Sequence, residues 1–181
     1  MIKNIFITGK PGCGKTTLIR EILKELKIPA RGFFTQEIRR EGERIGFEII
    51  TLTGKKGILA EKGIKSSYKV SKYNVVLRDL EEIGVKEIKE GLKENSLIII
   101  DEVGKMELFS QKFKKVLSIV LESENKILGT IMLAPYRTRS DAGLKPNSFC
   151  DRIKQRPDTK IFYLTKENFQ EIKEKIKNLL K

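Results

Sequence analysis

The residues Gly9-Lys10-Pro11-Gly12-Cys13-Gly14-Lys15-Thr16 fit the pattern G-x-x-x-x-G-K-[ST]. The short apolar run Ile5–Ile7 precedes them and is typical of a buried strand. After them, apolar residues recur at helical spacing, at Leu18, Ile19, Ile22, Leu23 and Leu26. This order of strand, glycine-rich loop and helix predicts a P-loop, a segment whose backbone binds phosphate groups. A chance glycine-rich turn is the alternative, and the flanking strand and helix argue against it.

Each residue type in this loop has a physical reason to be there. Gly9, Gly12 and Gly14 allow positive φ angles and a close approach of the backbone to a ligand, because they have no Cβ. The loop N–H groups and the N-terminus of the following helix then converge on an anion. Lys15 is expected to reach the β- and γ-phosphates, and the Thr16 hydroxyl to bind Mg²⁺. The predicted nucleotide-binding segment also includes Lys10, Pro11, Cys13 and Thr17.

The composition is that of a basic chain without imidazole groups. The chain has 181 residues, of which 37 are Lys or Arg and 24 are Asp or Glu, so its net charge is +13, and it has no His. The length predicts one domain over residues 1–181. Positive charge can attract nucleic acid, a membrane surface or nucleotides, but these lysines are scattered among glutamates, which favours simple solvation of helix faces. Without His, acid–base chemistry falls to carboxylates or Lys.

The sequence also indicates the cellular compartment of the protein. Cys13 and Cys150 have neither metal-type spacing nor the density of a disulfide framework. Nothing resembles a signal peptide, and no apolar run reaches the ~18 residues that a membrane span requires. We therefore expect a cytoplasmic protein without a membrane partner; the sequence does not determine its oligomeric state, although it favours a monomer.

Strand and helix patterns alternate along the chain, which predicts an α/β fold with a mainly parallel sheet flanked by helices. Residues 33–60 contain short strands separated by turns, and predict an antiparallel β-meander after the first helix, built into the parallel sheet or onto its edge. Residues 62–72 are expected to form a loop and residues 75–92 a helix. Further strands are predicted at residues 97–100, 127–132 and 160–164, with a last helix capped by Thr165. A ligand would lie at the carboxyl ends of the strands.

Asp101-Glu102 follows the apolar run Leu97–Ile100 directly. An acid at the end of a buried strand is the second element of a P-loop NTPase, so Asp101 is expected to bind Mg²⁺ opposite Thr16, or else to cap a turn. Glu102 can face the γ-phosphate and orient or deprotonate an attacking water. Activation of water favours hydrolysis over transfer to another acceptor. A surface glutamate at a strand end is the alternative interpretation of Glu102.

Residues 134–148 have no hydrophobic period and contain Pro135, Gly143 and Pro146, which predicts a long lid loop over about residues 134–151. An arginine finger can stabilise the charge on the transferring phosphoryl group. Arg137 and Arg139 are the first candidates, followed by Arg152 and Arg156; each has an ordinary surface role as its alternative. Thr130 either contacts the γ-phosphate or the attacking water, or is an ordinary strand threonine.

The stretch Asp101-Glu102-Val103-Gly104-Lys105-Met106-Glu107-Leu108 resembles the DE-[IV]-GKMEL signature of the THEP1-type nucleoside-triphosphatases. The resemblance extends to the P-loop, to Gly32–Glu37, to Gly46-Phe47 and to the Leu164–Asn168 segment. The chain departs from the family pattern at Asn74, where Gly is usual, and at Phe169, where Arg is usual.

This resemblance implies a RecA-like fold and Mg²⁺-dependent hydrolysis of nucleoside triphosphates to diphosphates with broad base tolerance. It assigns phosphate binding to residues 9–16, the metal to Asp101 and water activation to Glu102. Gly104 and Lys105 are included in the expected nucleotide site, and Lys105 either contacts phosphate or pairs with Glu107. Three alternatives stay open: a small-molecule or nucleotide kinase, which needs an acceptor pocket; a nucleic-acid-stimulated ATPase, which needs a basic stripe; and a non-catalytic nucleotide switch.

Overall fold

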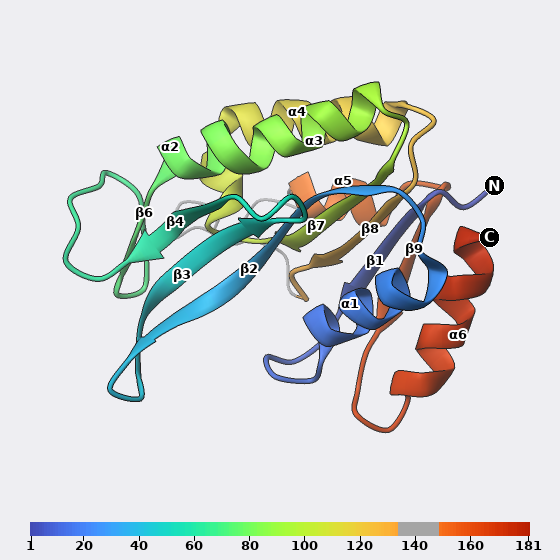
Figure 1. Ribbon diagram of the computed structural model, residues 1–181, viewed down its shortest axis with the longest axis horizontal. Helices are drawn as coiled ribbons and strands as arrows, with labels where there is room; N and C mark the ends of the chain where they lie inside the picture. The colour runs from blue at the N-terminus through green and yellow to red at the C-terminus, as the bar shows by residue number, and fades with distance from the viewer. Residues whose placement is uncertain (134–148) are drawn as a thin grey trace, which may run out of the picture.

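A mixed β-sheet runs through the centre of the computed structural model, which describes residues 1–133 and 149–181 (Figure 1). Five of its strands are parallel: β1 (Asn4–Thr8), β2 (Ala30–Arg40), β7 (Leu97–Val103), β8 (Ile127–Ile131) and β9 (Thr159–Tyr163). They lie in the order β2-β7-β8-β1-β9. Strand β8 therefore separates β1, which leads into the P-loop, from β7, which contains Asp101.

The antiparallel strands extend the same sheet beyond β2. They are β3 (Glu43–Thr51), β4 (Lys56–Glu61), β5 (Lys69–Val70) and β6 (Tyr73–Val75). Strand β2 pairs with β7 in parallel on one side and with β3 in an antiparallel manner on the other, so the sheet continues in the order β2-β3-β4-β6-β5. The predicted meander is thus present as an extension of the parallel edge, and it reaches Val75.

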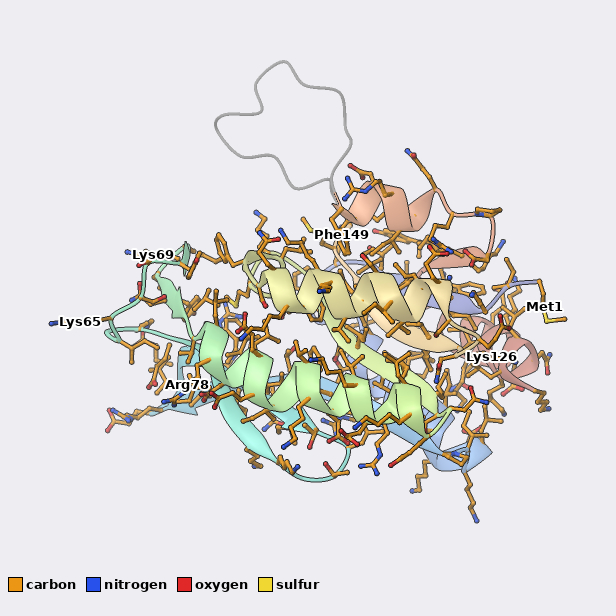
Figure 2. The ribbon with its side chains drawn as sticks, turned by 90° about the horizontal axis from the view of Figure 1, so that it is seen from above. Met1, Lys65, Lys69, Arg78, Lys126 and Phe149 are labelled. Carbon is orange, nitrogen blue, oxygen red and sulfur yellow. The ribbon has the colours of Figure 1, made fainter. Side chains whose placement is uncertain are left out.

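Helices cover both faces of the sheet (Figure 1). Helices α1 (Lys15–Leu26) and α6 (Phe169–Leu180) pack together on one face. The other face carries α2 (Leu77–Asp79), the π-helical turn η1 (Leu80–Val85), α3 (Lys86–Lys93), the 3-10 turn η2 (Glu107–Phe109), α4 (Gln111–Glu122) and α5 (Phe149–Lys154). Figure 2 shows α3 and α4 side by side across this second face. No helix of the described residues is long and apolar enough to cross a membrane.

Because both faces are covered, the central strands are apolar without alternation. In β1, Phe6 enters the core under α3 and α4, whereas Ile5 and Ile7 enter the core under α1 and α6, and all three are fully buried. The three-layer α/β arrangement predicted from the sequence is confirmed.

Several predicted boundaries are wrong. Strand β2 begins at Ala30 rather than Phe33. Gly32 can lie within this strand because it has no Cβ, which would lie 1.9 Å from the carbonyl oxygen of Ile99 in β7. The segment predicted as a loop contains β5, and the helix predicted from Val75 starts at Leu77, since Val75 pairs with β4. Helix α6 starts at Phe169 and Asn168 takes the cap position predicted for Thr165.

Candidate active site

The P-loop connects β1 to α1 through left-handed backbone positions. Gly14, with φ 100°, stands at the N-cap of α1, which starts at Lys15. Gly9, with φ 152°, passes so close to the neighbouring chain that a Cβ would lie 2.6 Å from the carbonyl oxygen of Leu164. Glycine is required at these two positions for different reasons: φ at Gly14 and space at Gly9. The N-terminal N–H groups of α1 consequently face the site at the carboxyl end of β1.

Lys15 lies back over this loop. Its Nζ donates hydrogen bonds to the carbonyl oxygens of Gly9, at 3.0 Å, and Lys10, at 3.2 Å. These two acceptors hold the ammonium group beside the loop N–H groups, where phosphate oxygens would compete for it.

Asp101 lies at the centre of a hydrogen-bonded group from three elements. The Thr16 hydroxyl donates to Asp101 Oδ2 at 2.5 Å, and the Thr130 hydroxyl donates to Asp101 Oδ1 at 2.6 Å. Thr130 reaches this position because Ile7 of β1 and Thr130 of β8 are register partners and β7 lies on the other side of β8. Side chains that follow β1 and β7, the two neighbours of β8, therefore come together at the carboxyl end of β8.

Burial and hydrogen bonding act on Asp101 in opposite directions. Asp101 is buried, with only 3% of the residue exposed. Burial raises the pKa of Asp101 above its usual value, and the hydrogen bonds from Thr130 and Thr16 and the nearby Lys15 charge oppose that rise. A cation bound beside the carboxylate would favour the ionised form further.

Thr16 and Asp101 have the donor chemistry that Mg²⁺ prefers. Both present oxygen atoms, and Mg²⁺ is usually held by one or two protein oxygens together with waters and substrate phosphates. Among residues 1–133 and 149–181, no group of three or more His, Cys, Asp or Glu side chains could hold a metal by itself. The residues fit a metal ion that arrives with a nucleotide.

Glu102 follows Asp101 and is half-buried. Burial raises the pKa of the Glu102 carboxyl, the Asp101 charge raises it further, and Lys15 lowers it. A carboxylate with a raised pKa is a better proton acceptor near neutral pH than an exposed one.

Gly104 and Glu107 form the turn beyond Glu102. The Gly104 N–H donates to Glu107 Oε2 at 3.1 Å. A Cβ on Gly104 would lie 3.1 Å from that same oxygen and 3.3 Å from Glu102 Cδ, so both carboxyl groups lie against Gly104. Burial, with the charge of Glu102 as the next cause, raises the pKa of Glu107 to about 8. Lys105 is exposed and does not pair with Glu107, and its contact with phosphate stays a prediction.

A cleft of about 420 Å³ lies beside the P-loop, on the side away from Asp101. Its walls are the P-loop residues Lys10–Cys13 and the segment Tyr163–Glu167, which joins β9 to α6. Phe169, where the family pattern has Arg, packs its ring against Gly14, at 3.3 Å from the position of a Cβ. This position supplies an apolar contact to the loop instead of a positive charge.

The structure separates the arginine candidates. Arg137 and Arg139, with most of the predicted lid, lie outside the described residues. Arg152 on α5 has its guanidinium group over the Phe149 ring, at 5.6 Å from the centroid. The proposal for Arg156 is wrong: it pairs with Asp158 and Glu122, and the Asp158 carbonyl oxygen accepts from the N–H groups that start β1. Arg156 therefore lies at the opposite end of β1 from the P-loop.

The α/β sheet, the P-loop after its first strand and the Asp101-Glu102 pair two strands away define a P-loop NTPase. Comparison with known proteins agrees, because a family model described as NTPase matches residues 4–177. The chain belongs to this family and is a nucleoside-triphosphatase.

Two curated relatives show how far the likeness extends. The nucleoside-triphosphatase THEP1 of Thermotoga sp. (strain RQ2) is 46% identical over 177 residues, which cover 98% of this chain and 95% of that one. The human cancer-related nucleoside-triphosphatase is 37% identical over 181 residues, covering 93% of this chain and 91% of the relative. The crystal structure of THEP1 from the hyperthermophile Aquifex aeolicus superposes with a TM-score of 0.83 at 36% identity, covering 98% of this chain and 99% of that one. The predicted family resemblance and the P-loop NTPase fold are both confirmed.

Three features of the site were missed from the sequence. The Thr130 hydroxyl donates to Asp101, Glu107 accepts from the Gly104 N–H, and the Tyr163–Glu167 segment forms a wall of the cleft. Only the last had a signal in the sequence, because the Leu164–Asn168 segment resembles the end of the family pattern.

Proposed function

We propose that this nucleoside-triphosphatase hydrolyses nucleoside 5'-triphosphates to diphosphate and phosphate with Mg²⁺ and with little selection among bases. The observation that carries the proposal is the contact between the Thr16 hydroxyl and the Asp101 carboxylate, with Glu102 as the next residue. Mg²⁺ bound at Thr16 and Asp101 would neutralise phosphate charge. The loop N–H groups of residues 9–16 bind the phosphate chain, and Lys15 leaves the Gly9 and Lys10 carbonyls to contact the β- and γ-phosphates.

Glu102 supplies the proton acceptor. It lies past Asp101 on β7, and its partly buried carboxylate takes a proton from water as the water oxygen attacks the γ-phosphorus. Thr130 holds Asp101 from the side of β8, so the carboxylate cannot turn away from Thr16. Thr130 is thus a positioning residue, and Glu102 is the catalytic residue that contacts the reacting water.

The cleft between the P-loop and the Tyr163–Glu167 segment accounts for loose base selection. The γ-phosphate end of the nucleotide faces Asp101 and Glu102, so the nucleoside extends the other way, into this cleft. Its walls supply backbone groups, the exposed Tyr163 ring and lysine side chains. Stacking on a ring and backbone contacts tolerate every base, whereas strong rejection needs dedicated hydrogen bonds to one base edge. No element of the sequence resembles the N-K-x-D guanine-reading motif.

The distribution of positive charge supports a small-molecule substrate over nucleic acid. Lys65 and Lys69 lie at one end of the molecule and Lys126 at the other (Figure 2). Lys126 is partly buried and donates to the carbonyl oxygens of Leu179 and Leu180. Many other lysines pair with glutamates, as Lys173 does with Glu21 and Glu25. Scattered and paired lysines do not form the continuous stripe that follows a phosphate backbone.

The test is phosphate release from ATP, GTP, CTP and UTP, each with and without Mg²⁺, in the absence of acceptor and nucleic acid. We expect steady turnover of all four with Mg²⁺ and none with excess chelator. Glu102→Gln should keep nucleotide binding and lose about 10²- to 10⁴-fold in rate, the usual share of a general base. Lys15→Ala should weaken both binding and turnover.

The matched control is Glu124→Gln, which removes one negative charge at an exposed position outside the site. Turnover restricted to one nucleotide would refute broad base tolerance. Near-normal turnover by Glu102→Gln would refute the assignment of the proton acceptor.

A further inference from the structure

A second cavity, of about 290 Å³, opens at Glu102. Its apolar wall consists of Phe47, Leu59, Val70, Met106 and Met132, which come from the antiparallel strands, the β7–η2 turn and the end of β8. None of its lining residues also lines the cleft beside the P-loop.

The order of the strands puts the two hollows on opposite sides of the Thr16–Asp101 pair. The P-loop cleft lies at the β1 and β9 end of the sheet, and the second cavity lies where β7 meets β2, β3 and β4. A nucleotide in the cleft would have its γ-phosphate at Asp101 and Glu102. The second cavity is then on the far side of the γ-phosphate, where a group that attacks the phosphorus in line must stand.

The size and lining of this cavity do not match the needs of hydrolysis alone. Water occupies ~30 Å³ in the liquid, so a space of about 290 Å³ is roughly ten times what one attacking water needs. Five of its ten lining residues have apolar side chains, beside the polar Thr35, Glu102, Lys105 and Glu107. Both properties suit the apolar body of a small organic molecule.

The wall is held in place by contacts outside the cavity. The Phe47 and Tyr73 rings meet edge to face, with centroids 5.1 Å apart. The Arg44 guanidinium lies over the Phe47 ring, 5.1 Å from its centroid, and its Nε donates to the Tyr73 hydroxyl at 2.9 Å. A pre-formed wall lowers the entropy cost of binding a ligand.

Building on the proposed hydrolysis, we propose that this cavity binds a small primary alcohol with an apolar or aromatic body, and that Glu102 deprotonates its hydroxyl for phosphoryl transfer. The alcohol oxygen forms a bond to the γ-phosphorus, and the bond from that phosphorus to the β–γ bridging oxygen breaks. The alcohol proton moves to Glu102, and the nucleoside diphosphate leaves with the bridging oxygen. The product is a phosphate monoester, and hydrolysis is the same reaction with water as the acceptor.

Polar groups at the rim complete the site. Thr35 of β2 lines the cavity and offers a hydroxyl that can orient the acceptor. Lys105 also lines it, is exposed, and has no hydrogen bond or ion pair with any residue in the described part of the chain. Its charge is available to the γ-phosphate as this group moves toward the acceptor.

The test measures ADP, inorganic phosphate and phosphate monoester by ³¹P NMR during turnover of Mg-ATP with benzyl alcohol, 2-phenylethanol or 1-hexanol. Ethylbenzene is the matched compound without a hydroxyl group. We expect the ratio of phosphate to ADP to fall below one with an alcohol, by the ratio of new monoester to ADP, and to stay at one with ethylbenzene. A ratio of one with all three alcohols, with or without inhibition, would overturn the proposal.

Substitutions in the cavity wall test whether the alcohol binds in this cavity. Val70→Trp fills the cavity, and Ile119→Trp adds the same side chain on the exposed face of α4 as a control. We expect Val70→Trp to lower the ratio of monoester to phosphate about tenfold or more, since the acceptor body is excluded and water is not. Thr35→Val, which keeps the volume, should lower the same ratio and serves where Val70→Trp does not fold. An unchanged ratio in a folded Val70→Trp or in Thr35→Val would place the acceptor elsewhere and refute the site.

The two proposals fail in different ways. Without any alcohol, absence of phosphate release overturns the proposed hydrolysis and leaves transfer to be measured by monoester formation. Normal phosphate release that no alcohol diverts overturns only the acceptor site.

Discussion

Glu107→Gln should change how the stability of this protein depends on pH. Glu107 is 4% exposed, and its pKa is raised from 4.5 to about 8, with burial as the main cause. The carboxyl group is protonated in both the folded and unfolded states below pH 4.5. Between that value and about 8 the folded protein keeps a proton that the unfolded chain releases. The free energy of unfolding therefore falls as pH rises through this window.

The magnitude follows from the two pKa values. Each unit of pKa difference corresponds to about 1.4 kcal/mol, so the full window corresponds to an upper limit of roughly 4 to 5 kcal/mol. Glutamine has the shape of the protonated acid and keeps an oxygen to accept from the Gly104 N–H. Glu107→Gln should thus resemble the wild type at pH 5 and exceed it by a few kcal/mol at pH 8.

The assay is urea unfolding followed by circular dichroism at pH 5, 6, 7 and 8 and constant ionic strength. The quantity of interest is the free energy of unfolding of the variant minus that of the wild type at each pH. Glu124→Gln, at an exposed position, is the control and should give a difference that does not change with pH. Parallel curves for Glu107→Gln and the wild type from pH 5 to pH 8 would refute the reasoning, because they would mean that Glu107 binds no extra proton in the folded state.

Three further substitutions test the packing and the metal site. Asp101→Asn should lower hydrolysis and move its Mg²⁺ dependence to concentrations about tenfold higher or more, because a charged ligand is lost; rates over a Mg²⁺ titration check this, and an unchanged midpoint would contradict it. Thr130→Val should cost about 1.5–3 kcal/mol of stability by removing a donor to a buried carboxylate, and urea unfolding that shows no loss would speak against the contact. Gly32→Ala should cost more than about 3 kcal/mol, because its Cβ would lie 1.9 Å from the Ile99 carbonyl oxygen. Gly42→Ala is its partner experiment: φ is also positive there but nothing lies within 4 Å, so a loss of only about 1 kcal/mol is expected, and equal losses would refute the steric argument.

Much of the fold and the centre of the site could be predicted from consecutive residues. The P-loop depends on spacing within residues 9–16, and its strand and helix are its direct neighbours, so local pattern is sufficient. Asp101 could be predicted as its counterpart because a buried apolar strand must end at the ligand edge of an α/β sheet. The two lie 85 residues apart, and the hydrogen bond between Thr16 and Asp101 bears out their proximity.

Boundaries were harder to predict where tertiary contacts overrode local signals. The strand was predicted to begin after Gly32, yet Gly32 lies inside β2 opposite Ile99 of β7, where a Cβ would lie 1.9 Å from the Ile99 carbonyl oxygen. Thr165 was predicted to cap the last helix. Its hydroxyl accepts from the Asn168 N–H at 3.4 Å and its N–H donates to Asn168 Oδ1 at 2.8 Å, but the helix itself starts only after Asn168.

The sequence by itself determined the class of this protein, because phosphate binding by a glycine-rich loop and an acid at a strand end are properties of short segments. The tertiary structure alone decided which strands are neighbours, because an alternation of strands and helices in the sequence is compatible with several strand orders in the sheet. The order β2-β7-β8-β1-β9 brings Thr130 to Asp101 and places the cleft and the apolar cavity on opposite sides of the Thr16–Asp101 pair. These features depend on register between segments far apart in the chain, which no local pattern contains.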